Sequence, residues 1–235
     1  MHLGMFDPTI ILLLPAIAFA FFAQAKVSSA YGKYAKVRNM KGMTGAQAAR
    51  IILDKNGLSN VGIEISKGKL SDHYDPGKRK VRLSPDVHNT PSIAALSIAA
   101  HEAGHAIQHA KGYSPLVIRS TIVPVVNIGS TLSWPLLILG MIIVAAGNYT
   151  QGNMIFNIGI FLFAGVVIFH AVTLPVEFNA SGRAMEELEQ CGIIRSDERK
   201  SAQKVLSAAA MTYVAALAVA VANLIRILII RGSND

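Results

Sequence analysis

The sequence predicts a mainly α-helical, polytopic membrane protein: four transmembrane helices with a small α+β part outside the membrane. Three observations support this fold class. The 235 residues are 52% hydrophobic and only 15% charged, with a mean hydropathy of +0.43. That composition is too apolar for an ordinary soluble domain. Four apolar stretches are each about long enough to cross a bilayer, and the segments between them hold most of the charges and turn signals.

The four predicted transmembrane helices cover residues 6–25, 121–147, 154–174 and 208–230. Two polar sections lie between them, at residues 26–118 and 175–207. Asp7 lies at the start of the first span and no Lys or Arg precedes it, the reverse of a secretory signal peptide, so we expect an uncleaved anchor. Pro175 predicts that the third span ends there and that a new helix begins.

Basic residues predict the orientation in the membrane. Of the 22 Lys and Arg residues, 15 lie at positions 26–119, 5 at 175–207 and 2 in or beyond the last span. Because Lys and Arg favour the cytoplasmic side, we expect both polar sections in the cytoplasm of a multi-pass cell-membrane protein and both termini outside. The formal charge of +8 is thereby explained without a nucleic-acid partner. The single cysteine, Cys191, excludes an internal disulfide.

Within the first polar section, Thr44 and Gln47 match a capping box for a helix that runs to about residue 55. Residues 61–65, 69–74 and 80–83 read as three short strands joined by turns, a β-meander. An apolar helix follows over Ile93–Ala110, with Thr90-Pro91 expected at its start and Gly112 after its end.

This helix contains the motif His101-Glu102-Ala103-Gly104-His105. Histidines four residues apart lie on one helix face and can bind one metal ion. Glu102 points to the side of that face, where it can hold a water molecule. The pattern is typical of zinc hydrolases, in which zinc lowers the pKa of water to about 7 and the glutamate accepts its proton. The alternative, two core histidines beside a buried unpaired glutamate, is energetically costly.

Catalytic zinc usually has three protein ligands, so a third must come from further along the chain. His109 is roughly 12 Å from His101 along the helix, too far to share the ion. Lys111 stands where a metzincin would have a histidine. Turns and strand surfaces explain other polar residues more easily, namely Asp72, His73, Asp75 and His88. The predicted orientation puts Glu177 on the same side as the two histidines, so it can reach their ion.

His170, near the end of the third span, has two readings of equal weight. An intramembrane histidine is a functional candidate by default, but it can also be a hydrogen-bonded packing residue.

The chain resembles the bacterial membrane-bound neutral zinc metallopeptidases. The likeness rests on four stretches and extends over nearly the whole chain: Ser71–Pro76, Val81–Ser84, Ser92–Ala95 leading into the motif, and Val176–Ser181. More distantly, it is similar to the heat-shock and prenyl-protein membrane zinc proteases, whose ligand glutamate stands in an E-x-x-A-D pattern. This resemblance implies that Glu177 is the third ligand. Ser181 replaces the aspartate, so its hydroxyl can bond a ligand histidine but carries no charge.

Motif and resemblance together imply a zincin-like catalytic part in a membrane zinc metallopeptidase that hydrolyses peptide or protein substrates at the cytoplasmic face. His101, His105 and Glu177 are expected to bind Zn²⁺, with Glu102 as general base. Tyr74, His73 and Arg183 are candidates for stabilising the oxyanion. One of the strands at 69–74 and 80–83 is expected to pair with the substrate backbone.

Two other functions fit the sequence less well. A catalytically silent membrane metal-binding scaffold would not need Glu102. An ion transporter would need several ionisable groups at mid-membrane depth, and the spans offer almost none. The sequence does not choose a substrate, a membrane-protein partner or a homo-oligomeric state.

Overall fold

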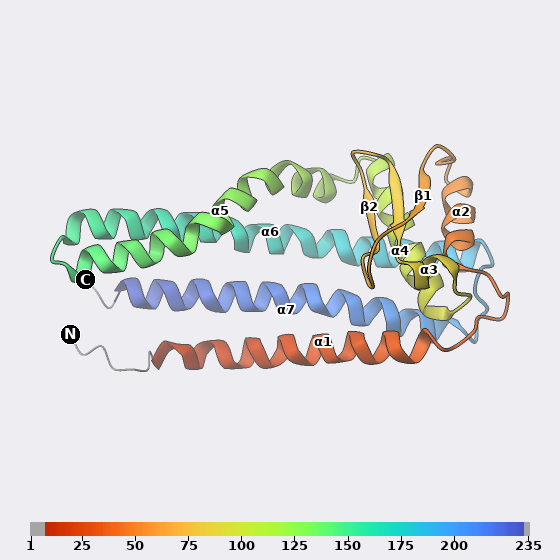
Figure 1. The fold of residues 1–235 in the computed structure, drawn as a ribbon, viewed down its shortest axis with the longest axis horizontal. Coiled ribbons are helices and arrows are strands. Elements are labelled where there is room, and N and C mark those ends of the chain that lie inside the picture. The colour runs from red at the N-terminus through yellow and green to blue at the C-terminus, as the bar shows by residue number, and fades with distance from the viewer. Residues whose placement is uncertain (1–7, 233–235) are drawn as a thin grey trace. The chain divides into compact units, whose positions relative to one another are not determined.

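The computed structural model describes residues 8–232 and divides into two compact units. The helical unit is formed from the described parts of residues 1–22, 118–173 and 213–235. The mixed unit is formed from residues 23–117 and 174–212. Each unit is described here by itself. Figure 1 shows the elements in chain order by colour.

Helices make up most of the chain, as predicted. In order, the elements are a 3₁₀ helix at Pro8–Leu13, α1 at Leu14–Tyr34, α2 at Gly45–Lys55, β1 at Gly62–Ile65, β2 at His73–Asp75, β3 at Lys80–Leu83, α3 at Pro85–Asn89, α4 at Ile93–Ala110, α5 at Ser114–Ala145, α6 at Tyr149–Gln190 and α7 at Arg199–Gly232. The predicted fold class is confirmed: mainly α, with a small three-stranded part.

Within the described residues, four helices are long and apolar enough to cross a membrane: Thr9–Tyr34, Ser114–Ala145, Tyr149–Gln190 and Arg199–Gly232. Residues 6 and 7 of the first predicted span lie outside the described part. The prediction that Pro175 starts a new helix is wrong, because Pro175 lies inside the continuous helix α6. Proline removes one backbone donor, but the turns on either side keep theirs, so a long helix can continue through it.

Close helix packing marks the helical unit. Leu137, Phe156, Phe163 and Ile227 form a buried apolar cluster there. A Cβ atom added to Gly140 would come within 2.7 Å of the backbone nitrogen of Phe156, so α5 and α6 approach closely at this point. Small residues commonly allow such contact between membrane helices.

The sheet of the mixed unit has the order β1-β3-β2. β1 pairs with β3 in parallel and β2 pairs with β3 in antiparallel. The predicted β-meander is therefore wrong, since β1 and β2 are both edge strands. The Ser66 amide donates to the Leu83 carbonyl at 2.8 Å, which holds the end of β1 on β3. The chain then crosses to the opposite edge, where the Asp72 carboxylate accepts hydrogen bonds from the Ser84 amide and hydroxyl.

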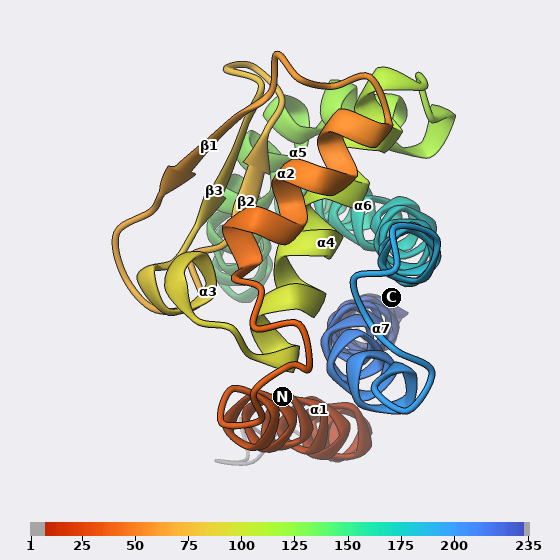
Figure 2. The same ribbon diagram turned by 90° about the vertical axis from the view of Figure 1, so that its right-hand side faces the viewer.

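Helices α2 and α4 lie on one face of this sheet (Figure 2). The predicted capping box at Thr44 and Gln47 is present at the start of α2. The N-cap of α4 is Ser92, whose hydroxyl accepts from the Ala95 amide, and not Thr90-Pro91 as predicted. The reason is that residues 85–89 form the short helix α3, which uses Thr90 as its C-cap. Gly112 follows α4 with a φ of +60°, as expected.

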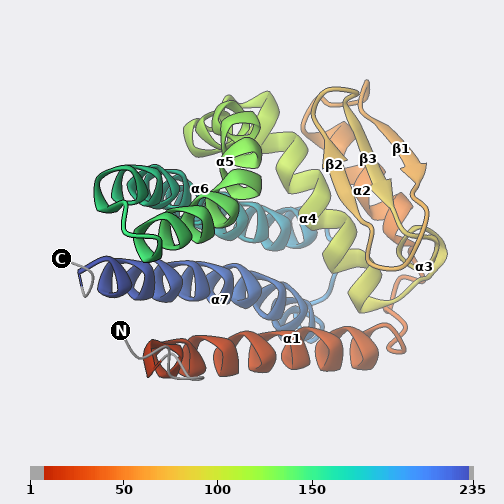
Figure 3. The same ribbon diagram turned by 60° about the vertical axis from the view of Figure 1, so that its left-hand side comes forward.

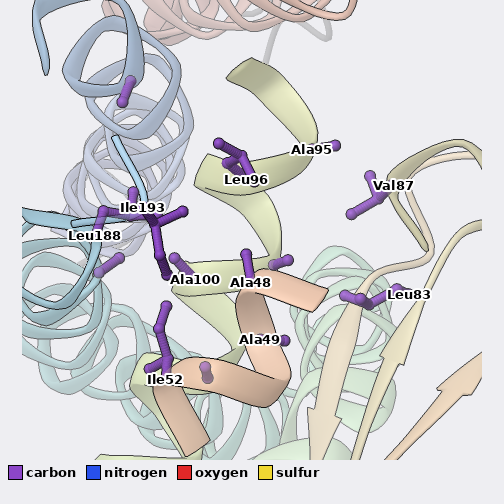
Figure 4. Packing of buried hydrophobic residues seen from close by; sticks show 14 of the residues in the cluster. Ala48, Ala49, Ile52, Leu83, Val87, Ala95, Leu96, Ala100, Leu188 and Ile193 are labelled. Carbon is purple, nitrogen blue, oxygen red and sulfur yellow. The ribbon is translucent and has the colours of Figure 1, made fainter. Parts of the chain in front are cut away.

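The core of the mixed unit is built mainly from small and branched side chains of α2 and α4. Figure 4 shows Ala48 and Ile52 of α2 beside Ala100 of α4, and Ala49 of α2 and Leu96 of α4 belong to the same cluster. Leu188 of α6 and Ile193 belong to the same cluster, so α6 is packed into this core together with α4. The alanines allow the helices to pack closely, which fixes the position of α4 relative to the C-terminal part of α6.

Candidate metal centre

The two motif histidines meet a carboxylate from a distant part of the chain. Helix α4 places His101 and His105 one turn apart, with ring centroids 4.7 Å apart and ring planes at 82°. Glu177 of α6, with only 1% of its surface exposed, points its carboxylate between them. Its Oε2 atom lies 3.2 Å from Nε2 of His101 and 3.5 Å from Nε2 of His105.

These separations suit a tetrahedral metal ion. Zinc bonds to His nitrogen and carboxylate oxygen are about 2.0–2.2 Å long, so two ligands of one tetrahedral zinc lie roughly 3.3–3.5 Å apart. Across the cluster, potential ligand atoms of the three residues all lie within 4.8 Å of one another. Two imidazoles and one carboxylate are also a donor set used by catalytic zinc sites. The three side chains therefore fit a zinc ion with a fourth position left open.

Gly104, inside the motif, allows α4 and α6 to approach each other. A Cβ atom at this position would lie 2.7 Å from the Ala180 carbonyl oxygen. That distance is shorter than real Cβ contacts, and the obstacle is backbone, which cannot easily move. A glycine between the two histidines is thus required for Glu177 to come as close to them as it does.

On the side away from Glu177, each histidine has a neutral partner. The Ser181 hydroxyl lies 3.2 Å from Nδ1 of His101. The Gln108 amide oxygen lies 3.0 Å from Nδ1 of His105, and Gln108 is fully buried. Hydrogen bonds of this kind orient a ligand imidazole and select its tautomer.

A chain of hydrogen bonds defines the tautomer of His105. The Arg183 guanidinium can only donate, and its Nε donates to Oδ1 of Asn179 at 2.8 Å. The amide nitrogen of Gln108 donates to that same oxygen at 3.0 Å and to the Val176 carbonyl at 2.8 Å. Gln108 therefore presents its oxygen to His105, whose Nδ1 must donate. In the neutral ring, Nε2 is therefore the nitrogen that keeps its lone pair, and it is the nitrogen on the side of Glu177, as a metal ligand requires.

The electrostatics of the site favour a cation. Burial lowers the pKa of His105, but the hydrogen bond to Glu177, the charges of Glu102 and Glu177 and the bond to Gln108 outweigh it and raise the pKa above its ordinary value. Glu102 itself is buried, with 8% of its surface exposed. Among the described residues, no donor forms a hydrogen bond with its carboxylate, so that group remains available to a water molecule.

The other predicted site residues lie outside this cluster. Tyr74 of β2 bonds Nδ1 of His109 through its hydroxyl at 2.9 Å. His73 bonds the Ser71 carbonyl at 2.8 Å, and Arg183 is held by Asn179. His170 belongs to the helical unit, where the centroid of its ring lies 5.8 Å from that of Phe169.

The polar residues expected to serve turns and strand surfaces do so. Asp72 bonds Ser84, and Asp75 pairs with Arg82 at 2.7 Å. His88 bonds the side chain of its neighbour Asn89 at 2.7 Å.

Gln108 and Asn179 were not predicted as site residues. One signal was available for Gln108: it stands three residues after His105 on a helix that is otherwise almost wholly apolar. A buried amide there needs partners, and a motif histidine one turn away is one of them. For Asn179, the only signal was its position two residues after Glu177.

Comparison with known proteins agrees with this geometry. The model of the family described as "Putative neutral zinc metallopeptidase" matches residues 9–232. The chain belongs to this family. It is also 48% identical over 221 residues to "Putative membrane protease YugP" of Bacillus subtilis (strain 168), covering 94% of this chain and 95% of that protein. No solved structure matches the chain.

Membership in this zinc metallopeptidase family confirms the resemblance stated from the sequence. It implies zinc as the metal, and the cluster of His101, His105 and Glu177 is a group that could bind it. The four apolar helices agree with the membrane location in the name of the relative.

Proposed function

We propose that this protein is a zinc endopeptidase of the cell membrane that cleaves peptides or proteins at the cytoplasmic face. The observation that carries the proposal is the convergence of His101, His105 and Glu177 at ligand distances from one another, with Glu102 next to them. In this reading the first three residues hold Zn²⁺ and Glu102 is the general base.

A zinc ion held there would lower the pKa of a water molecule and polarise the scissile carbonyl. Glu102 would take a proton from the attacking water and then give it to the leaving amine. Gln108 and Ser181 would keep Nδ1 of each histidine occupied, so that both Nε2 atoms point to the ion.

The strand order favours one of the two strands that were expected to bind the substrate backbone. β3 is the central strand and has no free edge, so the expectation that residues 80–83 pair with a substrate is wrong. β2 is an edge strand and lies on the side of the sheet nearest α4 (Figure 3). An extended peptide could add to β2 through main-chain hydrogen bonds, which would give broad sequence tolerance.

Each of the three oxyanion candidates already has a protein partner. Tyr74 lies on β2, and its hydroxyl bonds His109, one turn beyond His105 on α4. These two residues also line a pocket of about 280 Å³ that could receive a substrate side chain. Ring nitrogens of His73 are occupied by Ser71 and Arg82, and Arg183 is engaged by Asn179.

The test is metal analysis and casein cleavage with the full-length protein in detergent, comparing wild type with Glu102→Gln. We expect about one zinc per chain in both, cleavage by the wild type, and loss of at least about 10²-fold in turnover in the variant. A zinc-containing wild type without any cleavage of casein or of a peptide library would favour the silent scaffold. Equal cleavage by both proteins would contradict the assigned role of Glu102.

A further inference from the structure

A cavity of about 520 Å³ lies between α1 and α7 within the mixed unit. Its walls follow the helical repeat on both sides: residues 26, 29, 30 and 33 of α1, and residues 200, 203, 204, 207, 208 and 211 of α7. Tyr34 completes the lining. The two helix segments run side by side in opposite directions, as Figures 1 and 2 show. We call this cavity the lysine groove.

Four of the eleven lining residues are lysines: Lys26, Lys33, Lys200 and Lys204. None of the described lining residues is acidic. In the part of the chain that the structure describes, Lys200 and Lys204 form no ion pair, whereas their neighbour Arg199 is paired with Glu189. Around one cavity, these charges create a strongly positive potential that suits an anion.

The groove is also apolar in part. Ala208 and Tyr34 are buried in its wall, and Ala30 and Met211 are half-buried. On both helices the groove lies where an apolar stretch meets a basic one. Lys26 follows the apolar start of α1, and Lys204 precedes the apolar remainder of α7. A ligand there would have an anionic end among the lysines and an apolar end along the helices.

We propose that the lysine groove binds the phosphate headgroup of an anionic phospholipid. Basic pockets between transmembrane helices on the cytoplasmic side suit such headgroups. The orientation preference of Lys and Arg explains why basic residues lie on this side, but it does not require four of them to meet around one cavity. Free phosphate offers the same charge, but it would leave the apolar wall unused. This proposal does not depend on zinc or on peptidase activity.

Native mass spectrometry of delipidated full-length protein tests the proposal, with phosphatidylglycerol, phosphatidylcholine and glycerol 3-phosphate titrated separately. We expect phosphatidylglycerol to bind at least about tenfold more tightly than the other two. Lys200→Gln/Lys204→Gln should weaken phosphatidylglycerol binding about 25-fold, since each lysine near a phosphate contributes roughly a factor of five. Lys200→Arg/Lys204→Arg should retain it.

The matched control is Lys36→Gln/Lys41→Gln, which removes the same charge from exposed positions just after α1. Its lipid affinity should stay within about twofold of the wild type. Equal weakening in both double variants would overturn the groove as the site, and equal binding of glycerol 3-phosphate would overturn the lipid as the ligand. Thermal unfolding midpoints without lipid, expected to be unchanged, show that each variant is folded.

Discussion

Nδ1 of His105 donates a hydrogen bond of 3.0 Å to Oε1 of Gln108, a buried amide one turn further along the same helix. The direction of this bond follows from the partners of the Gln108 amide nitrogen, which donates to the Val176 carbonyl and to Oδ1 of Asn179, and Arg183 in turn donates to that oxygen. A half-buried guanidinium on α6 thus helps to determine which nitrogen of His105 is free to bind metal.

Replacing Gln108 by Leu should weaken zinc binding about 10–100-fold, because His105 loses the partner that orients its ring. The measurement is zinc affinity by competition with a chelator. Gln190→Leu is the control, since Gln190 is an exposed amide at the end of α6 that bonds Glu186 and Lys55 and lies outside the hydrogen-bond chain of His105. If Gln108→Leu bound zinc as tightly as the wild type, the hydrogen-bond chain would have no role in the metal site.

Gly104→Ala should destabilise the protein by about 1–3 kcal/mol and weaken zinc binding, because the new methyl group meets the Ala180 carbonyl. Gly182→Ala is the matched control: it lies on the exposed side of α6 and a Cβ there has nothing within 4 Å. That variant should be unchanged or more stable by about 0.5–1 kcal/mol, as expected for alanine in a helix. Thermal unfolding in detergent measures both, and similar effects at the two positions would contradict the close approach.

Glu177→Ala should lose zinc as completely as His105→Ala, whereas Glu186→Ala and Glu187→Ala should keep it. Glu186 accepts a hydrogen bond from Gln190, and Glu187 pairs with Lys55 at 3.2 Å, so both carboxylates already have ordinary partners. Zinc content per chain after dialysis is the readout. A zinc-retaining Glu177→Ala protein would mean that the third ligand is elsewhere.

The stability of the mixed unit should fall as the pH rises from about 3.8, the ordinary pKa of an aspartate, through the raised pKa of Asp72. Burial raises the pKa of this carboxyl despite the hydrogen bonds from Ser84, so the folded state holds its proton more tightly than the unfolded state. The stabilisation is complete below the ordinary pKa and is lost above the raised one. Relative to Asp72→Asn, whose amide oxygen can still accept from Ser84, wild-type stability should fall across this window. A relative rise in thermal midpoint with pH would contradict the direction.

Peptide tags inserted into the chain, tested for accessibility from either side of the membrane, would measure its orientation. We expect tags at residues 60 and 195 to be accessible from the cytoplasm and a tag at residue 150 from outside, because of the distribution of Lys and Arg. Labelling of residues 60 and 195 from opposite sides would exclude Glu177 as a ligand of the motif histidines.

Much of this molecule could be predicted because its signals are local. The spacing of His101 and His105 puts both on one face of any helix, and apolar stretches of sufficient length identify membrane helices without knowledge of their packing. The capping box at Thr44 and Gln47 is likewise complete within four residues.

Other features depend on contacts between distant segments, which no local pattern contains. β1 pairs with β3 and not with its neighbour β2, because pairing depends on where the crossing segment is anchored, and Ser84 holds that segment through Asp72. Pro175 has a local preference to end a helix, but the apolar span before it and the core contacts of Leu188 after it both favour helix. Asn179 becomes important only once α4 supplies Gln108 beside it.

The uninterrupted course of α6 has a mechanical consequence. One rod of 42 residues contains both a stretch that suits the bilayer and the carboxylate that faces the two histidines. Membrane helices adjust their tilt to the thickness of the lipid around them. Along α6 no turn or loop separates the apolar stretch from Glu177, so the carboxylate has no flexible linker to the segment that lipid would surround, and Pro175 is the position between them where the helix lacks a backbone donor.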